Sequence, residues 1–428
     1  MEVLNATITR LQETVETTPE GHPDRGKWLC YLDMHLRSRY EQTGNLQDLE
    51  AAINYAKAAV TATPEGQPYR VVMLTNVGDG LRSRYTRTGN LPDMEAAINY
   101  AEAAVAATPG EHPYRVVTLT KLGIHFGSRY ERTGYLQDLE TAIDYAETAL
   151  KITPEDHPAW AGCLNNLGRQ LEMRYDQTGN LEDLKAAINH AEAAVKATPE
   201  DHPKRAGWLN NLGVYLSSRY ERSGNFQDLE AAINHVEKAV KTASESHSNW
   251  AELLNNLGSH LSRRYSRTGN LEDLEAAITH TETAVNAMPV DHLDRAKWMS
   301  NLGDYLSSQY ERTGNLEYLE AAIKYARRAV NAITEDRLHW IDYLINFLNH
   351  LSRRYQRTGN LEDLEAVLIQ AGRAVKGLPE THPDRADLFH SLSNPLCFRY
   401  ERTGNLKGQG ILTTSHHAKP QQTSVARL

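Results

Sequence analysis

Residues 218–233 read SRYERSGNFQDLEAAI, and this pattern returns every 45 residues along a chain of 428 residues. At each return a glycine follows a tyrosine by four residues, nine times in all: Gly44, Gly89, Gly134, Gly179, Gly224, Gly269, Gly314, Gly359 and Gly404. A fixed period of this length is typical of a solenoid, whose units bury their apolar faces only against their neighbours. The period therefore predicts one elongated repeat domain, although the length alone would suggest two or three domains.

The clearest unit, residues 203–242, predicts two helices joined by a short turn. Apolar residues recur three and four positions apart in both halves, at Leu209, Leu212, Leu216 and Tyr220, and then at Phe226, Leu229, Ile233, Val236 and Val240. Between the halves, Gly224 suits the left-handed conformation that ends a helix. The predicted fold is all-α: a right-handed α-solenoid of stacked antiparallel helix pairs.

The ends of the two helices carry recognisable capping residues. Arg219 and Arg222 fall in the last turn of the first helix, where cations suit the helix dipole. Asn225, with Asp228 three residues later, predicts a capping box at the start of the second helix. Pro203 suits the first position of the first helix.

Composition and charge limit the class of partner and compartment. A formal charge of −9 provides no basic stripe for phosphates, so we expect neither nucleic acid nor anionic membrane as a partner. The sequence has no apolar run of transmembrane length and no signal peptide at its start, which predicts a soluble, cytoplasmic chain. The cysteines Cys30, Cys163 and Cys397 are too scattered for a disulfide framework or a zinc cluster.

Several residues of the unit resemble a lengthened tetratricopeptide repeat. Leu167-Gly168, Ala187, Ala194 and Pro199 match that family's Leu-Gly pair, two alanines and closing proline, in a unit of 45 rather than 34 residues. The consensus RYERTGNLEDLEAAI more specifically resembles fungal aromatic di-alanine and tetratricopeptide arrays, which often adjoin CHAT or NACHT domains. For activity, the resemblance implies protein binding only.

The repeat covers residues 1–405, and residues 406–428 do not follow it. Residues 1–17 align with the second half of a later unit, so the array begins with half a repeat. After residue 405 the second helix is replaced by KGQGILTTSHHAKPQQTSVARL, which lacks a helical period and predicts a disordered tail. We expect either a missing downstream effector domain or self-association through the uncapped C-terminal end.

Histidine recurs at one position of the predicted loops, which raises the question of a metal site. The seven are His22, His112, His157, His202, His247, His292 and His382. A metal needs three or four converging ligands, whereas this pattern supplies one histidine per unit, with stacked helices about 8–10 Å apart. The pattern therefore favours structural capping, and we expect no metal and no cofactor.

Asparagine is the better candidate for a binding residue. One first-helix position carries Asn76, Asn166, Asn211, Asn256, Asn301 and Asn346, and Asn165, Asn210 and Asn255 precede three of them. In tetratricopeptide repeats these positions line the concave groove, where amides can pair with the backbone of an extended peptide. The alternative is that they bridge adjacent helices and face no ligand.

Signatures of catalysis are absent from the sequence. It contains no HExxH, no GxSxG and no phosphate-binding glycine loop. An α/α-type hydrolase, the enzymatic alternative, would need a facing pair of acids outside the repeat pattern, and no such pair stands out. The sequence thus predicts a non-catalytic scaffold that binds a protein or peptide in its groove, as the sensor or recruitment arm of a larger regulatory protein.

Overall fold

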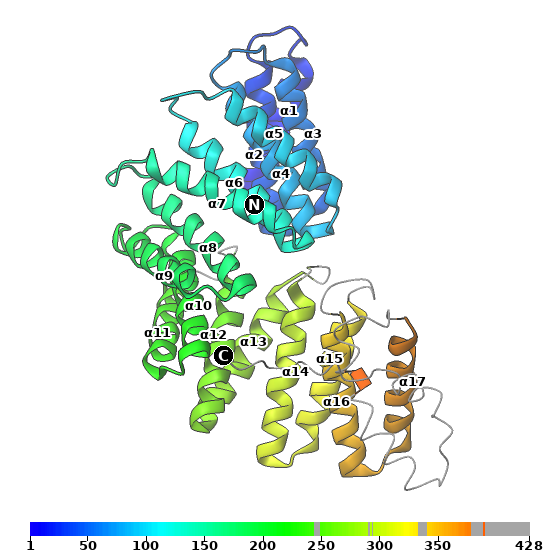
Figure 1. Ribbon diagram of the computed structural model, residues 1–428. Coiled ribbons are helices and arrows are strands. Elements are labelled where there is room, and N and C mark those ends of the chain that lie inside the picture. Colours follow the sequence, from blue (N-terminus) through cyan, green and yellow to red (C-terminus); the bar gives the residue numbers. More distant parts are fainter. Residues whose placement is uncertain (244–248, 290–291, 293, 333–339, 378–387, 390–428) are drawn as a thin grey trace. The chain divides into compact units, whose positions relative to one another are not determined.

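The computed structural model describes residues 1–243, 249–289, 292, 294–332, 340–377 and 388–389. Within these ranges the chain forms 17 α-helices and no β-strand (Figure 1). The predicted all-α class is therefore confirmed. No helix among these residues is long and apolar enough to cross a membrane.

The helices alternate between a first and a second helix of each unit. The first helices are α2 (Arg25–Thr43), α4 (Arg70–Thr88), α6 (Arg115–Thr133), α8 (Trp160–Thr178), α10 (Arg205–Ser223), α12 (Trp250–Thr268), α14 (Asp294–Thr313) and α16 (Trp340–Thr358). The second helices are α1 (Glu2–Thr17), α3 (Leu46–Ala62), α5 (Leu91–Ala106), α7 (Leu136–Lys151), α9 (Leu181–Lys196), α11 (Phe226–Thr242), α13 (Leu271–Ala287), α15 (Leu316–Asn331) and α17 (Leu361–Gly377).

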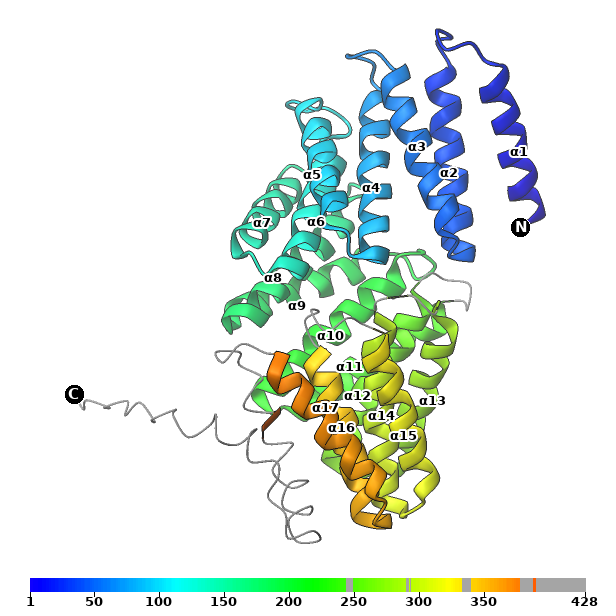
Figure 2. The same ribbon diagram turned by 90° about the vertical axis from the view of Figure 1, so that its right-hand side faces the viewer.

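The chain divides into two compact units, Met1–Pro289 with α1 to α13, and a second unit that begins at Val290. In the first unit, α1, α2, α3 and α4 stand side by side (Figure 2). In the second unit, α14 to α17 pack in chain order (Figure 1). The single predicted domain 1–405 stays a prediction, and the predicted tail 406–428 lies outside the described residues.

Within each compact unit, every helix packs against the helices that precede and follow it, from α1 to α13 and from α14 to α17. Consecutive first helices also contact each other, from α2 through α12 in the first unit and between α14 and α16 in the second. The first helices therefore form the layer in which neighbouring 45-residue repeats meet directly. The face of this layer is called here the inner face.

Small residues allow the close contact between the two helices of a unit. In α10, a Cβ added to Gly213 would lie 2.5 Å from Cγ2 of Val236 and 3.1 Å from the carbonyl oxygen of Ala232 in α11. Leu229 and Ala232 are completely buried beside this contact. The glycine of the Leu-Gly pair is thus required by the proximity of the second helix.

The turn between the helices is held by an ion pair rather than by the predicted capping box. Gly224 has φ of 69°, as predicted for a left-handed helix end. The side chain of Asn225 accepts a hydrogen bond from the N–H of Gln227, so it does cap α11. The carboxylate of Asp228 instead pairs with Arg219, through Nε at 2.9 Å and Nη2 at 2.7 Å. The capping box is therefore wrong, because the arginine nine residues earlier takes the acid.

This two-point pair, called here the Arg–Asp fork, recurs throughout the described chain. The forks are Arg39–Asp48, Arg84–Asp93, Arg129–Asp138, Arg174–Asp183, Arg219–Asp228, Arg264–Asp273 and Arg354–Asp363. The unit of α14 and α15 carries Gln309 and Tyr318 at these positions. Parallel N–H···O bonds of this kind fix orientation as well as distance, so each fork sets the angle between the helices it joins.

The loops between units are also ordered by specific bonds. Helix α10 begins at Arg205 rather than at Pro203, because the N–H of Arg205 bonds to the carbonyl of His202 and Pro203 occupies the second position of that turn. The prediction of Pro203 as the first helical residue is therefore wrong. The guanidinium of Arg205 donates to the carbonyls of Val195, at 2.6 Å, and of Thr198. This bond, called here the arginine staple, fastens α10 to the end of α9.

Candidate functional site

The predicted asparagines lie on first helices, and several of them bridge to the preceding first helix. In each bridge the side-chain N–H of an asparagine donates to a side-chain oxygen of the preceding first helix. The bridges run from Asn76 to Asp33 at 3.0 Å, from Asn211 to Asn165 at 2.9 Å, from Asn256 to Asn210 at 3.0 Å and from Asn346 to Asp304 at 3.0 Å. The structure therefore shows helix bridging, the alternative raised from the sequence, for these four.

The same region also contains a cleft, which four of the nine asparagines line. It spans α8, α10 and α12 and has a volume of about 600 Å³. Asn165, Asn166, Asn210 and Asn211 line it, together with Arg169, Lys204, Gly207, Trp208, Glu252 and Leu253. We call this the amide cleft. Its volume falls within the range of about 300–1,000 Å³ that is common for ligand sites.

The asparagine side chains differ in how many hydrogen-bonding groups they leave free for a ligand. Asn210 and Asn255 are only 3% and 4% exposed, so their side chains serve mainly the protein itself. Asn166 and Asn301 are half-buried, and neither side chain makes a hydrogen bond to any described residue. Since a side-chain amide has two donors and an acceptor, Asn166 brings unused hydrogen-bonding capacity to the amide cleft.

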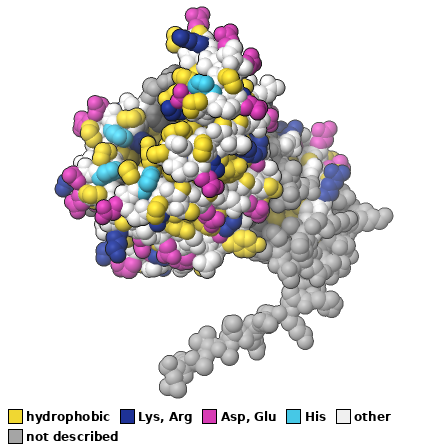
Figure 3. Space-filling model, turned by 90° about the horizontal axis from the view of Figure 1, so that it is seen from above, with side chains coloured by type: hydrophobic (Ala, Val, Ile, Leu, Met, Phe, Trp, Pro, Cys, Tyr) yellow, Lys and Arg dark blue, Asp and Glu magenta, His cyan; other side chains and the backbone are white. Residues whose placement is uncertain are grey.

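Charged side chains of both signs line the cleft, namely Arg169, Lys204 and Glu252. The guanidinium of Arg169 forms an ion pair with Glu131 of α6. Glu172, three residues further along α8 and outside the lining, has its pKa raised to about 7 by burial, an effect that Asp176 increases and Arg169 opposes. On the face shown in Figure 3, basic and acidic side chains are likewise interspersed. The cleft thus suits a polar, uncharged group such as a peptide backbone at least as well as an ion.

One glycine that lines the cleft was not predicted from the sequence. Gly207 lines it, and a Cβ added there would meet nothing within 4 Å. Gly162 stands at the same position one unit earlier and is equally open, but it does not line the cleft. Other units carry larger residues at this position, such as Val72 and Val117. A glycine here was therefore the feature of the sequence that could have indicated open space.

A row of buried histidines also escaped sequence reasoning. His125, His260 and His350 occupy one position of α6, α12 and α16 and are at most 2% exposed. Burial lowers the pKa of His125 and of His260 to about 3, so both rings are neutral. Next to His125, Gly78 of the preceding first helix leaves room for the ring. These imidazoles fill space between consecutive units.

The loop histidines have the structural role predicted for them. In each described case Nδ1 accepts the N–H of the residue two positions later, at 3.1–3.2 Å, in His22, His112, His157, His202 and His292. The capping role is confirmed for these five, whereas His247 and His382 lie outside the described residues. In the described ranges no group of three or more His, Cys, Asp or Glu side chains is placed to hold a metal. Cys30 and Cys163 are buried free thiols.

The described helices thus form successive pairs whose first helices contact one another within each compact unit. Residues 295–336 match the tetratricopeptide repeat family. The match covers one unit, and the other units share its helix pair, turn glycine and period. The chain is therefore a tetratricopeptide-like helical repeat array.

Solved structures support the same fold. The chain resembles the human IFIT1 dimer with PPP-AAAA, at a TM-score of 0.58 and 13% identity, over 92% of this chain and 78% of that one. It also resembles a signal transduction ATPase with numerous domains (STAND) that has a tetratricopeptide repeat sensor, PH0952 from Pyrococcus horikoshii, at a TM-score of 0.57 and 13% identity. That match covers 92% of this chain and 52% of the ATPase. No curated protein sequence matches the chain significantly.

Proposed function

We propose that this tetratricopeptide-like array is a non-catalytic scaffold that binds an extended segment of a protein partner in the amide cleft. The observation that carries the proposal is the side chain of Asn166, which lines the cleft and makes no hydrogen bond within the described part of the chain. Beside it, Asn165 and Asn211 bond to each other and are held in place. A peptide backbone supplies the matching donors and acceptors along its length.

The proposed context is regulatory. The STAND ATPase named above carries a tetratricopeptide repeat sensor, and this chain covers about half of that protein. We propose by analogy that the array serves as the sensor or recruitment arm of a larger protein. The IFIT1 structure contains PPP-AAAA, but for this chain the formal charge of −9 favours a protein partner over RNA.

A peptide selection tests the cleft directly. A phage-displayed library of random peptides would be selected on the full chain, and the binders would then be measured by titration against two variants. Gly207→Leu fills the cleft, while Gly162→Leu makes the same change at the equivalent open position outside it. We expect Gly207→Leu to abolish binding and Gly162→Leu to leave it unchanged.

A third variant tests the amide itself. Asn166→Ala is expected to weaken the selected peptides about five- to tenfold, since one hydrogen bond contributes about 1 kcal/mol. Unlike Asn211 or Asn256, Asn166 bridges no helices, so its removal leaves the fold unchanged. Peptides that bind both leucine variants equally well would refute the amide cleft as the binding site.

A further inference from the structure

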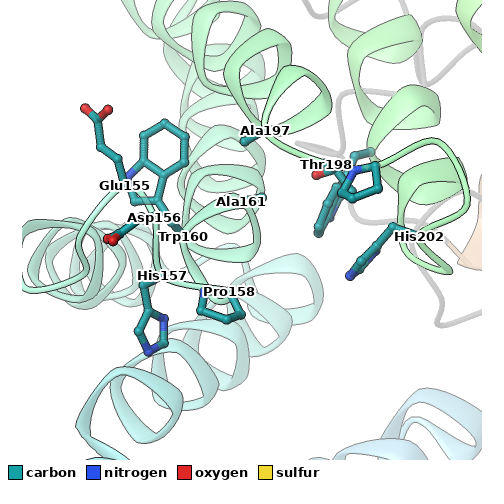
Figure 4. Close-up of a pocket in the computed structure, with 11 residues that line it drawn as sticks. Glu155, Asp156, His157, Pro158, Trp160, Ala161, Ala197, Thr198 and His202 are labelled. Atoms are coloured by element: carbon teal, nitrogen blue, oxygen red, sulfur yellow. The ribbon is translucent and has the colours of Figure 1, made fainter.

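A second cavity lies at the edge of the array, between two consecutive loops. It has a volume of about 300 Å³ and is lined by the loop before α8 and the loop before α10. Trp160 lies on one side and His202 on the other (Figure 4). Trp208, which also lines the cavity, stacks on His202. We call this the indole pocket. Trp208 also borders the amide cleft, so the two cavities are neighbours.

At the indole pocket, tryptophan occupies a position that is arginine in several other units, and Trp250 and Trp340 hold the same position in α12 and α16. The position of Trp160 is occupied by Arg25, Arg70, Arg115 and Arg205 in other units, where each arginine forms the staple to the preceding second helix. An indole cannot donate to two carbonyls in this way. Trp160 instead remains half-buried and forms a wall of the pocket.

The opposite wall is rigid. Trp208 is 6% exposed and stacks on the ring of His202, with centroids 5.3 Å apart and planes inclined by 19°. Pro158 and Pro199 add further fixed rings to the lining. A pocket whose walls are already ordered loses little side-chain entropy when it is filled.

The charges at the indole pocket have one sign. Glu155 and Asp156, both exposed, line its rim, and no lysine or arginine is among the lining residues. Arg205 lies nearby, but its guanidinium is occupied by the carbonyls of Val195 and Thr198. Aromatic faces next to carboxylates are the usual environment for a bound organic cation.

We infer that the indole pocket binds a cationic side chain, lysine or arginine, presented by a protein partner. The cation would lie against the indole of Trp160, with Glu155 and Asp156 balancing its charge. Only the source of the side chain, a protein partner, rests on the proposed function. The pocket itself can be tested with free amino-acid derivatives that do not need the amide cleft.

The test uses 19F NMR of the full chain labelled with 5-fluorotryptophan, which gives one signal for each of six tryptophans. Signals would be assigned with single Trp→Phe variants. N-acetyl-arginine amide and N-acetyl-lysine amide are the probes, and N-acetyl-norleucine amide is the uncharged control. We expect saturable shifts of Trp160 and Trp208 with the cationic probes only, while Trp28 stays unchanged. Absence of these shifts, or an equal response to norleucine amide, would overturn the inference.

Two variants complete the design. Trp160→Arg copies the residue of the stapled units, so it should fold normally, and it should weaken binding of the cationic probes at least fivefold. The pair Glu155→Gln with Asp156→Asn should weaken them by a similar factor. If Trp160→Arg binds the probes as the parent does, the pocket assignment is wrong, whatever the result at the amide cleft.

Discussion

At the scale of single residues, two glycines of α10 have opposite surroundings. A Cβ at Gly213 would meet Val236 and the backbone of α11, whereas a Cβ at Gly207 would project into open space. Glycine in a helix is less favourable than alanine by about 1 kcal/mol, so the environment decides the sign of each substitution.

We expect Gly207→Ala to raise the free energy of unfolding by about 1 kcal/mol. Gly213→Ala should lower it by about 1–3 kcal/mol, because α11 must move away from the added carbon. Thermal unfolding followed by circular dichroism measures both, and the two variants control for each other because they share one helix. Equal shifts of the midpoint in the same direction would show that packing against α11 is not what requires Gly213.

A buried acid gives a second prediction at this scale. Asp33 of α2 is 1% exposed, and burial raises its pKa to about 6 in spite of its pair with Arg37 and the bond from Asn76. Because this value lies above the ordinary 3.8, the folded state binds the proton more tightly than the unfolded state. Stability should therefore fall as the pH rises from about 4 to about 6, and remain lower above that range.

The variant Asp33→Asn tests this pH dependence. It resembles the protonated acid, so it should lose this part of the decline, which is on the order of 3 kcal/mol. Urea unfolding of parent and variant at pH 4, 5, 6 and 8 gives the comparison. An identical pH profile for both proteins would contradict the raised pKa of Asp33.

At the scale of elements, the Arg–Asp fork is the recurring joint between the two helices of a unit. Its aspartate is nearly buried, and its arginine comes from the last turns of the first helix. The α14–α15 pair has Gln309 and Tyr318 instead, and the side-chain oxygen of Gln309 is buried without a hydrogen bond to any described residue. That pair is joined by packing without a fork.

Restoring the fork should show a measurable coupling. We expect the free energy of unfolding of the double variant Gln309→Arg with Tyr318→Asp to exceed by about 1 kcal/mol the value that adding the effects of the two single variants would give. The reason is that a two-point ion pair forms only in the double variant. A double-mutant cycle from urea unfolding measures this coupling. A coupling near zero would mean that the α14–α15 turn differs from the others in more than these two side chains.

At the scale of the whole molecule, the helix contacts of the described residues join consecutive helices and consecutive first helices. In such an array each repeat is stabilised mainly by its neighbours. We expect a fragment of residues 1–289, the first compact unit, to fold without the second unit. Its helix content per residue should match that of the full chain, and its amides in α8 and α10 should keep their hydrogen-exchange protection. A fragment without protected amides would show that the first unit needs the second one in order to fold.

The sequence predicted the parts of the fold that lie within one unit. The apolar spacing in residues 203–242 predicted both helices, and Gly224 was correctly placed in the left-handed turn. The capping box failed because Asp228 has a stronger partner, Arg219, on the other side of the turn. The sequence pattern shows that Asp228 has two possible partners, Asn225 and Arg219. It does not show which one Asp228 binds, because that depends on the angle between the two helices.

The candidate site was less predictable because it depends on how units stack. The asparagine positions were recognised, but the bond from Asn211 to Asn165 joins residues 46 apart, and no pattern within one unit reports it. The openness at Gly207 and the missing staple at Trp160 also depend on neighbouring helices. Ligand binding by the predicted asparagines stays a prediction.

The fork has a consequence for how such a chain can lengthen or shorten during evolution. Its two residues are nine apart and belong to one unit, so a duplication or deletion of 45 residues carries every joint intact to its new place. The asparagine bridges from Asn211 to Asn165 and from Asn256 to Asn210 each span 46 residues and connect different units. A gained or lost repeat therefore preserves the forks but brings together new pairs of side chains on the inner face. Changes in repeat number would then alter the proposed binding surface and leave each helix pair intact.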